Sequence, residues 1–422
     1  MKKILTAGFA AAAVGLVVVT AAVPSNAVTP SEAAASPSQI TGQIIVKFRD
    51  NGASAGLLRQ HGLSEGAGIG STGAHVVNVP AGTESRLVEA LSRNPAVEYA
   101  EPDQVLTAAT SDTYFPSQYA LQNTGQSFTN TAGDISIAKG DADADVDAVE
   151  AWSLASGNGI KVAVLDSGVD LDHPDIHPKV VARANFSGAA TNEDKYGHGT
   201  HVAGIVAASH NTFGVAGVCP ECTILAGKVL DDRGIGSSSG LANGINWAVS
   251  NGAKVINMSI GVRASRTLET AINNAWSKGV VLVAAAGNGG NTSKIYPAAY
   301  PNVIAVAATD NKDAKASFST YGASWVDIAA PGVNVYSTFP DQDFALAGPN
   351  NRSLSYDVGN GTSMSSPIVA ATVALAWSRN PSATNQIIRD TVEDTADHIN
   401  GTGTFWDNGR VNACRAVGGN CL

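Results

Sequence analysis

Residues 161–168 read KVAVLDSG, and the pattern of this stretch decides the fold. Four successive apolar residues, followed by an acid and a glycine, are typical of a strand that is buried on both faces of a parallel sheet. Similar runs recur further along the chain: TILAGKVL at 223–230, KVINMS at 254–259, VVLVAAAG at 280–287 and NVIAVAA at 302–308.

Segments with helical character separate these runs: HVAGIVAAS at 201–209, SGLANGINWAVSN at 239–251 and LETAINNAWSKG at 268–279. Short apolar strands that alternate with helices predict an α/β domain built on a doubly wound, mostly parallel sheet. Such sheets bind ligands outside the carboxyl ends of their strands. Polar residues directly after each run are therefore the first candidates for a functional site.

A different pattern comes before residue 108. The segments QIIVKF, AGLLRQHG, HVVNVP, ESRLVEALSRN and VEYAEPDQVL predict the order strand, helix, strand, helix, strand. This order is typical of a small α+β plait of the ferredoxin-like type, with amphipathic helices on one face of an antiparallel sheet. We assign the plait to residues 41–107, a small polar linker to 28–40 and the larger domain to 108–422.

The first 27 residues carry two lysines, an apolar centre and the small-residue ending Ser25-Asn26-Ala27. This pattern predicts a secretory signal, with an uncleaved membrane anchor as the alternative. The formal charge of −10 and the pI of 5.2 disfavour nucleic acid or an anionic membrane as a partner. We therefore predict a secreted, extracellular protein that is monomeric and has no membrane contact once mature.

Four cysteines suit an oxidising compartment and allow three pairings. Cys219 and Cys222 form the motif CPEC, and Cys414 and Cys421 lie close together near the C-terminus. We favour two local disulfides. A redox motif or half of a zinc site is the alternative for CPEC, although no second CxxC or paired histidine completes a tetrahedral ligand set.

Two of the polar candidates are an acid and a histidine. Asp166 ends the run at 161–166, and a partly desolvated acid at a strand end needs a hydrogen-bonding partner. The segment YGHGTHVAG places His198 and His201 at the start of a helix. A zinc site is the alternative for the two histidines, but they lack the HExxH spacing and a third ligand.

Two further candidates follow later in the chain. Asn288 comes after the run at 280–287, where its amide either closes a tight turn or donates to a developing oxyanion. The segment NGTSMSSP at 360–367 places Ser363 at a helix start. A serine there either caps the helix or exploits the positive end of the helix dipole as a nucleophile.

Together these four residues supply every role that acyl transfer requires. His198 would deprotonate Ser363, Asp166 would orient the histidine, and Asn288 would stabilise the oxyanion. The chain lacks the G-x-S-x-G elbow around Ser363, which disfavours a serine esterase of the α/β-hydrolase type. The order Asp, His, Ser is the order found in subtilisin.

The chain resembles the subtilisin-like serine proteases (subtilases, peptidase family S8) over residues 111–415. The matching segments are VAVLDSGVDLDHPDI, GHGTHVAG, KVINMSIG, AAAGN and NGTSMSSP. The resemblance implies a secreted serine endopeptidase with the catalytic residues Asp166, His198, Ser363 and Asn288 and no catalytic cofactor. Its expected substrates are proteins and peptides. A secreted pseudoprotease or binding protein on the same scaffold is the alternative.

The resemblance also implies that residues 41–107 are an inhibitory prodomain that acts as an intramolecular partner. Its tail would lie in the active site until the protein cuts itself near residues 107–111. A permanently attached binding domain is the alternative.

The resemblance further assigns residues to substrate binding, and an apolar primary pocket of reduced depth follows from Ile295 at its floor. The substrate-binding residues are Ser259, Ile260, Gly261, Ala285, Ala286, Gly287 and Ile295. The resemblance also implies one structural calcium site, and six oxygen ligands suit that ion. Its ligands would be Asp112, Asp175, Ser209, Asn211, Phe213 and Val215.

Two other segments were weighed as calcium loops. ANFSGAATNED matches the position of a second calcium loop found in part of the family, but it lacks that loop's early aspartates. The acidic run GDADADVD lacks the Gly and Glu of an EF-hand, and we predict a solvated surface loop there.

Overall fold

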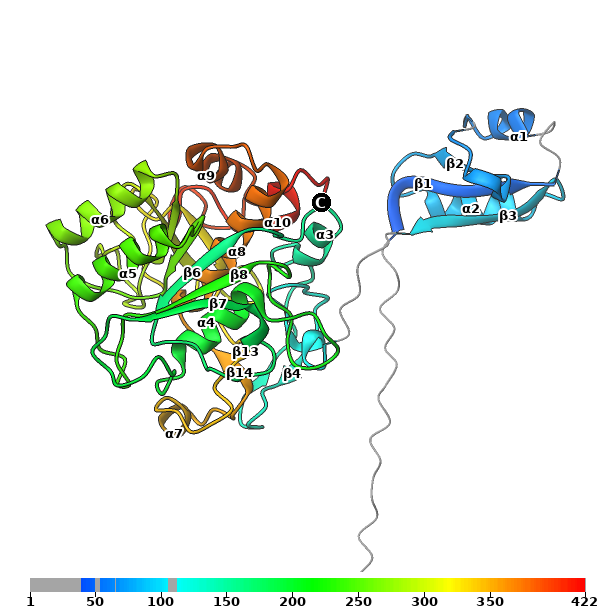
Figure 1. Cartoon of the computed structure of the whole chain (residues 1–422). Coiled ribbons are helices and arrows are strands. Elements are labelled where there is room, and N and C mark those ends of the chain that lie inside the picture. The colour runs from blue at the N-terminus through cyan, green and yellow to red at the C-terminus, as the bar shows by residue number, and fades with distance from the viewer. Residues whose placement is uncertain (1–38, 50–53, 65, 105–111, 422) are drawn as a thin grey trace, which may run out of the picture. The chain divides into compact units, whose positions relative to one another are not determined.

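The structure is a computed structural model, and it describes residues 39–49, 54–64, 66–104 and 112–421. The chain divides into two compact units, at residues 1–104 and 105–422, which are described separately (Figure 1). The predicted signal peptide, most of the predicted linker and the predicted processing region at 107–111 lie outside the described residues. No helix in the described part of the chain is both long enough and apolar enough to cross a membrane.

The N-terminal unit has the predicted order of elements. These are β1 (Gln39–Phe48), α1 (Ser54–Gln60), β2 (Ala74–Asn78), α2 (Glu84–Ser92) and β3 (Val97–Gln104). The strands form an antiparallel sheet in the order β2-β1-β3. Since β1 begins at Gln39, the linker predicted for 28–40 extends two residues too far.

A ferredoxin-like plait has a fourth strand, and in this unit a short extended segment takes its place. Residues 66–69 run antiparallel to β2 through a single bridge between Gly68 and His75. Backbone bonds of 2.9 Å from Val76 N to Ala67 O and 2.8 Å from Ile69 N to Ala74 O support the bridge. A short turn (η2, Gly70–Thr72) then leads directly into β2.

The larger unit contains the predicted parallel sheet. Its strands are β6 (Lys161–Asp166), β7 (Val180–Asn185), β8 (Thr223–Lys228), β9 (Val255–Met258), β10 (Val281–Ala285), β11 (Val303–Thr309) and β12 (Ile328–Pro331). The order is β12-β11-β10-β9-β6-β8-β7, and every pair is parallel. The edge strands β7 and β12 were not predicted. One is incompletely buried and the other has four residues, so neither forms a long apolar run.

Helices cover both faces of this sheet (Figure 1). Along β6, Val162 and Val164 pack into the core that contains α4 (His198–Ala207) and α8 (Thr362–Arg379). The alternate residues Ala163 and Leu165 pack into a second core with α5 (Ser238–Ser250) and α6 (Arg266–Ser277). Successive side chains of a strand point to opposite faces of the sheet, and both faces are buried. Side chains of either kind therefore meet apolar neighbours, which explains the uninterrupted apolar runs.

Helix α8 is buried from Thr362 to Trp377, with Ser363 as the single exception. A buried polar chain fixes this helix to the sheet. Ser366 Oγ donates to Asn257 Oδ1 at 2.6 Å, and Asn257 Nδ2 donates to Ser259 Oγ at 3.0 Å. Ser259 Oγ then donates to Ser363 O at 2.8 Å, so the start of α8 is held at the end of β9.

The remaining elements surround this body. They are β4 (Phe128–Thr129), β5 (Ser136–Ile137), α3 (Ala148–Trp152), α9 (Asn385–Asp394), α10 (Ala413–Ala416), the antiparallel pair β13 (Val335–Thr338) and β14 (Tyr356–Gly359), the short helix α7 (Ala347–Asn350) between them, and the 3-10 turns η3 (Phe115–Ser117) and η4 (His177–Lys179). The disulfides Cys219–Cys222 and Cys414–Cys421 confirm the two predicted local pairings.

The prediction of a solvated loop for the acidic run GDADADVD is wrong for its second half, whereas Asp141 and Asp143 are exposed as predicted. Asp145 and Asp147 are buried, and burial raises the pKa of Asp147 to about 7. Asp145 accepts the backbone N–H groups of Asn123 and Asp147, and Asp147 accepts the side-chain amide of Asn412. A prediction from charge density alone therefore fails for Asp145 and Asp147, because internal hydrogen bonds replace water around their carboxylates.

Candidate functional site

The first part of the site is a buried acid–imidazole pair. Asp166 is the last residue of β6 and is fully buried, while His198 is the first residue of α4 with 18% of its side chain exposed. His198 Nδ1 donates to Asp166 Oδ1 at 2.8 Å, and Ser167 N–H donates to the same oxygen at 2.7 Å. The Nε2 atom of the imidazole is thereby left for a second partner.

Opposing effects set the ionisation of this histidine. Burial lowers the pKa of His198, whereas the charge and hydrogen bond of Asp166, together with the charge of Asp194, raise it. The net direction is upward from the ordinary value of 6.5. His201, three residues further along α4, behaves in the opposite way, because complete burial and the neighbouring His198 lower its pKa to about 3. His201 is therefore a neutral core residue.

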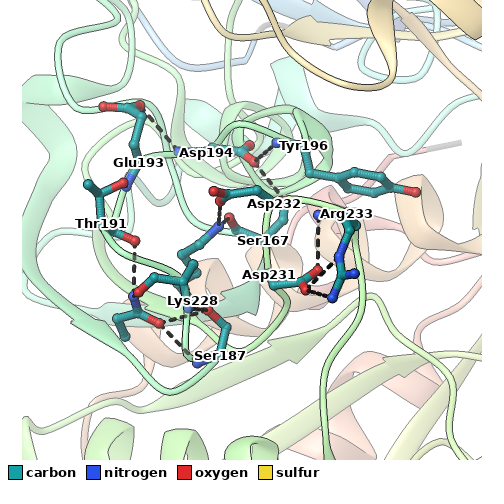
Figure 2. A network of polar contacts seen from close by, with 12 residues as sticks. Ser167, Ser187, Thr191, Glu193, Asp194, Tyr196, Lys228, Asp231, Asp232 and Arg233 are labelled. Carbon is teal, nitrogen blue, oxygen red and sulfur yellow. Dashed lines mark hydrogen bonds and ion pairs between the residues drawn. The ribbon is translucent and has the colours of Figure 1, made fainter.

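Ser167, the residue after Asp166, bonds to both Asp194 and Lys228 (Figure 2). Its hydroxyl donates to Asp194 Oδ1 at 2.8 Å and accepts the N–H of Gly199 at 2.9 Å. Its carbonyl accepts the ammonium of the buried Lys228 at the end of β8, and that ammonium also lies 3.0 Å from Asp232 Oδ1. The end of β6 is thus tied to β8 and to the first turn of α4.

Asp194 organises the segment that leads into α4. It is fully buried and accepts the N–H groups of Tyr196, Gly197 and Thr200 at 2.8–3.2 Å, besides the hydroxyl of Thr200. A carboxylate at this place satisfies free N–H donors at the helix start. The sequence analysis missed Asp194, because it lies three residues before the N-cap Gly197 and so outside the position where a capping side chain is expected.

Ser363 and Asn288 meet on the other side of the site. Ser363 lies in the first turn of α8, and its hydroxyl donates to Ser259 O at 3.2 Å. Asn288 Oδ1 accepts both the N–H and the hydroxyl of Thr362, at 2.9 and 3.0 Å. Because the amide oxygen is occupied, its amino group is the end left for a ligand, and Thr362 is a second residue that the sequence analysis missed.

Asn288 and Ser363 line two cavities, and His198 lines only the second of them. The first cavity contains six of the seven predicted substrate-binding residues: Ser259, Ile260, Gly261, Ala285, Gly287 and Ile295. Ala286 is the exception. It is buried in a separate apolar cluster with Trp406, because successive side chains of an extended chain point to opposite sides.

Ile295 fills the space between the walls of this first cavity. A Cβ atom added at Gly261 would lie 3.0 Å from Ile295 Cγ2, and one added at Gly287 would lie 3.0 Å from Ile295 Cγ1. The two glycines thus allow the isoleucine to occupy the cavity floor. Thr320, which the sequence analysis missed, also lines this cavity and accepts the N–H of Gly289 at 3.1 Å.

Hydrogen bonds connect the six residues predicted for calcium. Asp112 Oδ1 accepts the N–H groups of Asn211 and Thr212, each at 2.8 Å. Asp175 accepts the amide of Asn211 at 2.8 Å and the N–H of Val215 at 2.9 Å. Two further bonds connect the remaining residues: Ser209 N–H to Asp175 O and Phe213 N–H to Asn211 Oδ1.

The charge of this cluster favours a cation. Asp112 and Asp175 are both buried. Burial and the charge of Asp112 raise the pKa of Asp175 to about 6, although the hydrogen bonds from Val215 and Asn211 act in the opposite direction. Two buried carboxylates with nearby amide and carbonyl groups form the type of donor set that hard cations such as calcium prefer.

A second acidic group lies elsewhere. Oxygens of Asp170, Asp172 and Asp341 lie within 4.8 Å of one another, and this group is a possible metal-binding group. Asp170 is buried and its oxygens accept the N–H groups of Asp172 and Asp341, while the other two acids are exposed.

A family model described as the subtilase family, peptidase S8, matches residues 157–414. The chain belongs to the subtilase family. A second model, described as the fervidolysin N-terminal prodomain, matches residues 25–103. The chain is therefore a subtilisin-type serine protease with an N-terminal prodomain, as the sequence resemblance predicted.

Individual subtilases support this assignment. The chain is 50% identical to thermitase of Thermoactinomyces vulgaris over 275 residues, which cover 64% of this chain and 93% of thermitase. It is 42% identical over 343 residues to a thermophilic serine proteinase of Bacillus sp. strain AK1, covering 80% and 76% of the two chains. A solved protease structure from Pseudoalteromonas arctica matches with a TM-score of 0.64 and 29% identity, covering 74% of this chain and 99% of that one.

The acid–imidazole pair can be tested without reference to any activity. Asp166→Asn keeps a hydrogen-bond acceptor but removes the negative charge, so the pKa of His198 will fall from above 6.5 to below it as burial becomes the dominant effect. NMR titration of labelled histidine measures the shift. Asp172→Asn, a change at a nearby exposed acid, serves as the control. A wild-type pKa below 6.5, or an unchanged pKa in Asp166→Asn, would contradict the assignment.

Proposed function

We propose that this subtilase is a secreted serine endopeptidase that hydrolyses peptide bonds through Asp166, His198 and Ser363, with an acyl-enzyme intermediate. One observation carries the proposal. A buried acid holds the imidazole of His198 through Nδ1, and that imidazole lines the same cavity as Ser363 and Asn288. These residue types at one cavity supply a base, a nucleophile and an oxyanion donor.

In the first half of the reaction, Ser363 Oγ attacks the scissile carbonyl carbon and transfers its proton to His198 Nε2. The hydroxyl must first rotate away from Ser259 O, to which it donates in the structure. The negative charge of Asp166 stabilises the imidazolium that forms. The carbonyl oxygen becomes an oxyanion, which Asn288 Nδ2 and the backbone N–H of Ser363 bind, since the latter has no partner within the helix.

In the second half, the imidazolium returns its proton to the amine of the leaving peptide, and the C–N bond breaks to give an ester on Ser363. A water molecule then enters, gives a proton to His198 and attacks the ester carbonyl. The second tetrahedral intermediate collapses, the proton returns to Ser363 Oγ, and the carboxylic acid product leaves.

The cavity that contains Ile295 is proposed to hold the side chain before the scissile bond. Backbone groups of residues 259–261 would pair with the substrate as an added strand, which tolerates many sequences. Since Ile295 occupies the floor between Gly261 and Gly287, we expect medium-sized apolar side chains to be preferred over lysine or arginine.

The precursor is proposed to process itself. A signal at residues 1–27 would direct export, residues 41–107 would inhibit the active site, and cleavage near 107–111 would release residues 108–422 as the catalytic domain. The match of residues 25–103 to a subtilase prodomain supports the inhibitory role.

Calcium is proposed to bind at the loop that follows α4. Asp112 and Asp175 would supply carboxylates, Asn211 an amide oxygen, and Ser209, Phe213 and Val215 backbone carbonyls. Bound calcium would offset the mutual repulsion of the two buried acids, so its role is structural.

The nucleophile can be identified by exchanging neighbouring serines. Ser363→Ala will abolish casein hydrolysis and labelling by a serine-directed phosphonate, and the chain will remain uncut near residues 107–111. Ser365→Ala removes a buried hydroxyl two residues away and will keep both activities. Mass spectrometry and N-terminal sequencing of the secreted products provide the readout. Cleavage of pure Ser363→Ala at the junction would refute self-processing, and a wild-type protein without labelling or hydrolysis would indicate a pseudoprotease.

The oxyanion role of Asn288 has its own test. Asn288→Ala will lower kcat about 10²–10³-fold with the fold retained, a magnitude taken from the equivalent change in subtilisin, a member of this family. Steady-state kinetics and circular dichroism measure the two quantities. Asn302→Ala, at a surface site where the amide only reaches Asn273, is the matched control. Near-full activity of Asn288→Ala would exclude the role.

Chelation tests the calcium site. EDTA will lower the melting temperature of the wild type by about 5 °C, because a ligand that binds only the folded state stabilises it. Asp112→Asn will melt at lower temperature and lose most of its response to EDTA. Asp341→Asn, in the other acidic group, will keep that response. An unchanged melting curve of the wild type in EDTA would contradict the proposal.

A further inference from the structure

The two cavities at the site meet at Ser363 and Asn288 and differ in the residues beyond them. The first contains residues 259–261 and the Ile295 floor. The second contains His198 and, further out, Leu346, Arg352 and Asn360. If the proposed function holds, the scissile bond lies over Ser363, so the two cavities receive the substrate on opposite sides of that bond.

The position of His198 indicates which cavity receives the substrate residues after the scissile bond. A general acid must reach the nitrogen of the leaving amine, and His198 lines only the second cavity. The second cavity therefore faces the residues after the scissile bond. Its outer wall comes from residues 339–355, which connect β13 to β14 and carry α7 (Figure 1).

This connection is firmly anchored. Its ends are joined by hydrogen bonds from Phe339 N to Ser355 O at 2.7 Å and from Ser355 N to Pro340 O at 3.0 Å. Its middle binds the segment before His198 through Ala345 N to Lys195 O at 2.8 Å. Phe344 stacks on Phe339 with ring centroids 5.0 Å apart. A side chain on this connection thus has a defined place beside the reacting atoms.

Four residues of this connection line the cavity, and Arg352 is the charged one among them; Asp341 and Asp343 belong to the same connection but not to the lining. The backbone N–H of Arg352 donates to Ala347 O at 2.9 Å and its Nη1 donates to Asn350 O at 2.7 Å, which holds the half-buried side chain at the cavity. No carboxylate is present among the described residues that line the cavity, and Arg352 forms no ion pair within the described part of the chain. Outside the lining, the charge of Arg352 is one of the causes that lower the pKa of Asp134, which is exposed.

We propose that Arg352 selects substrates with an acidic side chain at the first or second position after the scissile bond. The guanidinium has donors left that match a carboxylate, and arginine binds carboxylates in a bidentate manner. An ion pair with solvent access changes an affinity by up to about fivefold. The preference rests on the proposed peptide hydrolysis but is independent of the pocket before the bond.

Fluorogenic peptides that differ only at the first two positions after the cleaved bond test this proposal. The wild type will cleave peptides with Asp or Glu there about fivefold faster, in kcat/KM, than peptides with Lys. Arg352→Gln will remove this preference, Arg352→Glu will reverse it, and Arg352→Lys will keep part of it. Salt at 1 M will weaken the wild-type preference, since screening acts on accessible charges.

Two controls separate the possible failures. A peptide p-nitroanilide has no amino acid after the cleaved bond, so Arg352→Gln will hydrolyse it within about twofold of the wild-type rate. The control variant Arg379→Gln, at the far end of α8, will leave all preferences unchanged. An equal rate for acidic and basic peptides in an enzyme that hydrolyses the anilide would overturn the role of Arg352 alone. A wild type that cleaves neither peptides nor the anilide would overturn the proposed function and this inference with it.

Discussion

The carboxylate of Asp166 lies fully buried at the end of β6, where water cannot hydrate it. Removing such an ion from water costs several kcal/mol, so the surrounding chain has to supply hydrogen bonds. His198 and the Ser167 N–H supply them to one carboxylate oxygen, at 2.8 and 2.7 Å. The same acid thereby determines which imidazole nitrogen remains for chemistry. The position of α4 and the structure of its first turn depend on this pairing.

Two buried polar networks hold the rest of the site in relation to this acid. Ser167, Asp194 and Lys228 connect the ends of β6 and β8 to the start of α4 (Figure 2). On the other side, Ser366, Asn257 and Ser259 connect α8 to the end of β9. Each network ends next to a residue of the proposed reaction. Since their members are buried, the loss of one partner would leave an unsatisfied polar group and would cost about 1–3 kcal/mol.

The two sides of the site have different origins in the fold. The cavity with Ile295 lies at the carboxyl ends of β9 and β10, the edge of a parallel sheet at which ligands bind. The wall with Arg352 lies on a connection between two antiparallel strands, outside the sheet. Connections of this kind vary in length more readily than strands do. The proposed reaction therefore relies on the sheet, whereas the proposed selection after the cleaved bond relies on this connection.

The sequence by itself determined the class of fold and predicted the chemical roles, because buried parallel strands need continuous apolar runs and acyl transfer needs particular residue types. It predicted β6, β8, β9, β10 and β11 and the side chains that follow them. Tertiary structure decided what depends on packing. It buried Asp145 and Asp147 in a run that reads as solvated, turned Ala286 away from the cavity and formed the edge strands β7 and β12. It also brought Arg352 to the cavity of His198, since contacts between distant segments follow from the three-dimensional packing of the chain and leave no local pattern in the sequence.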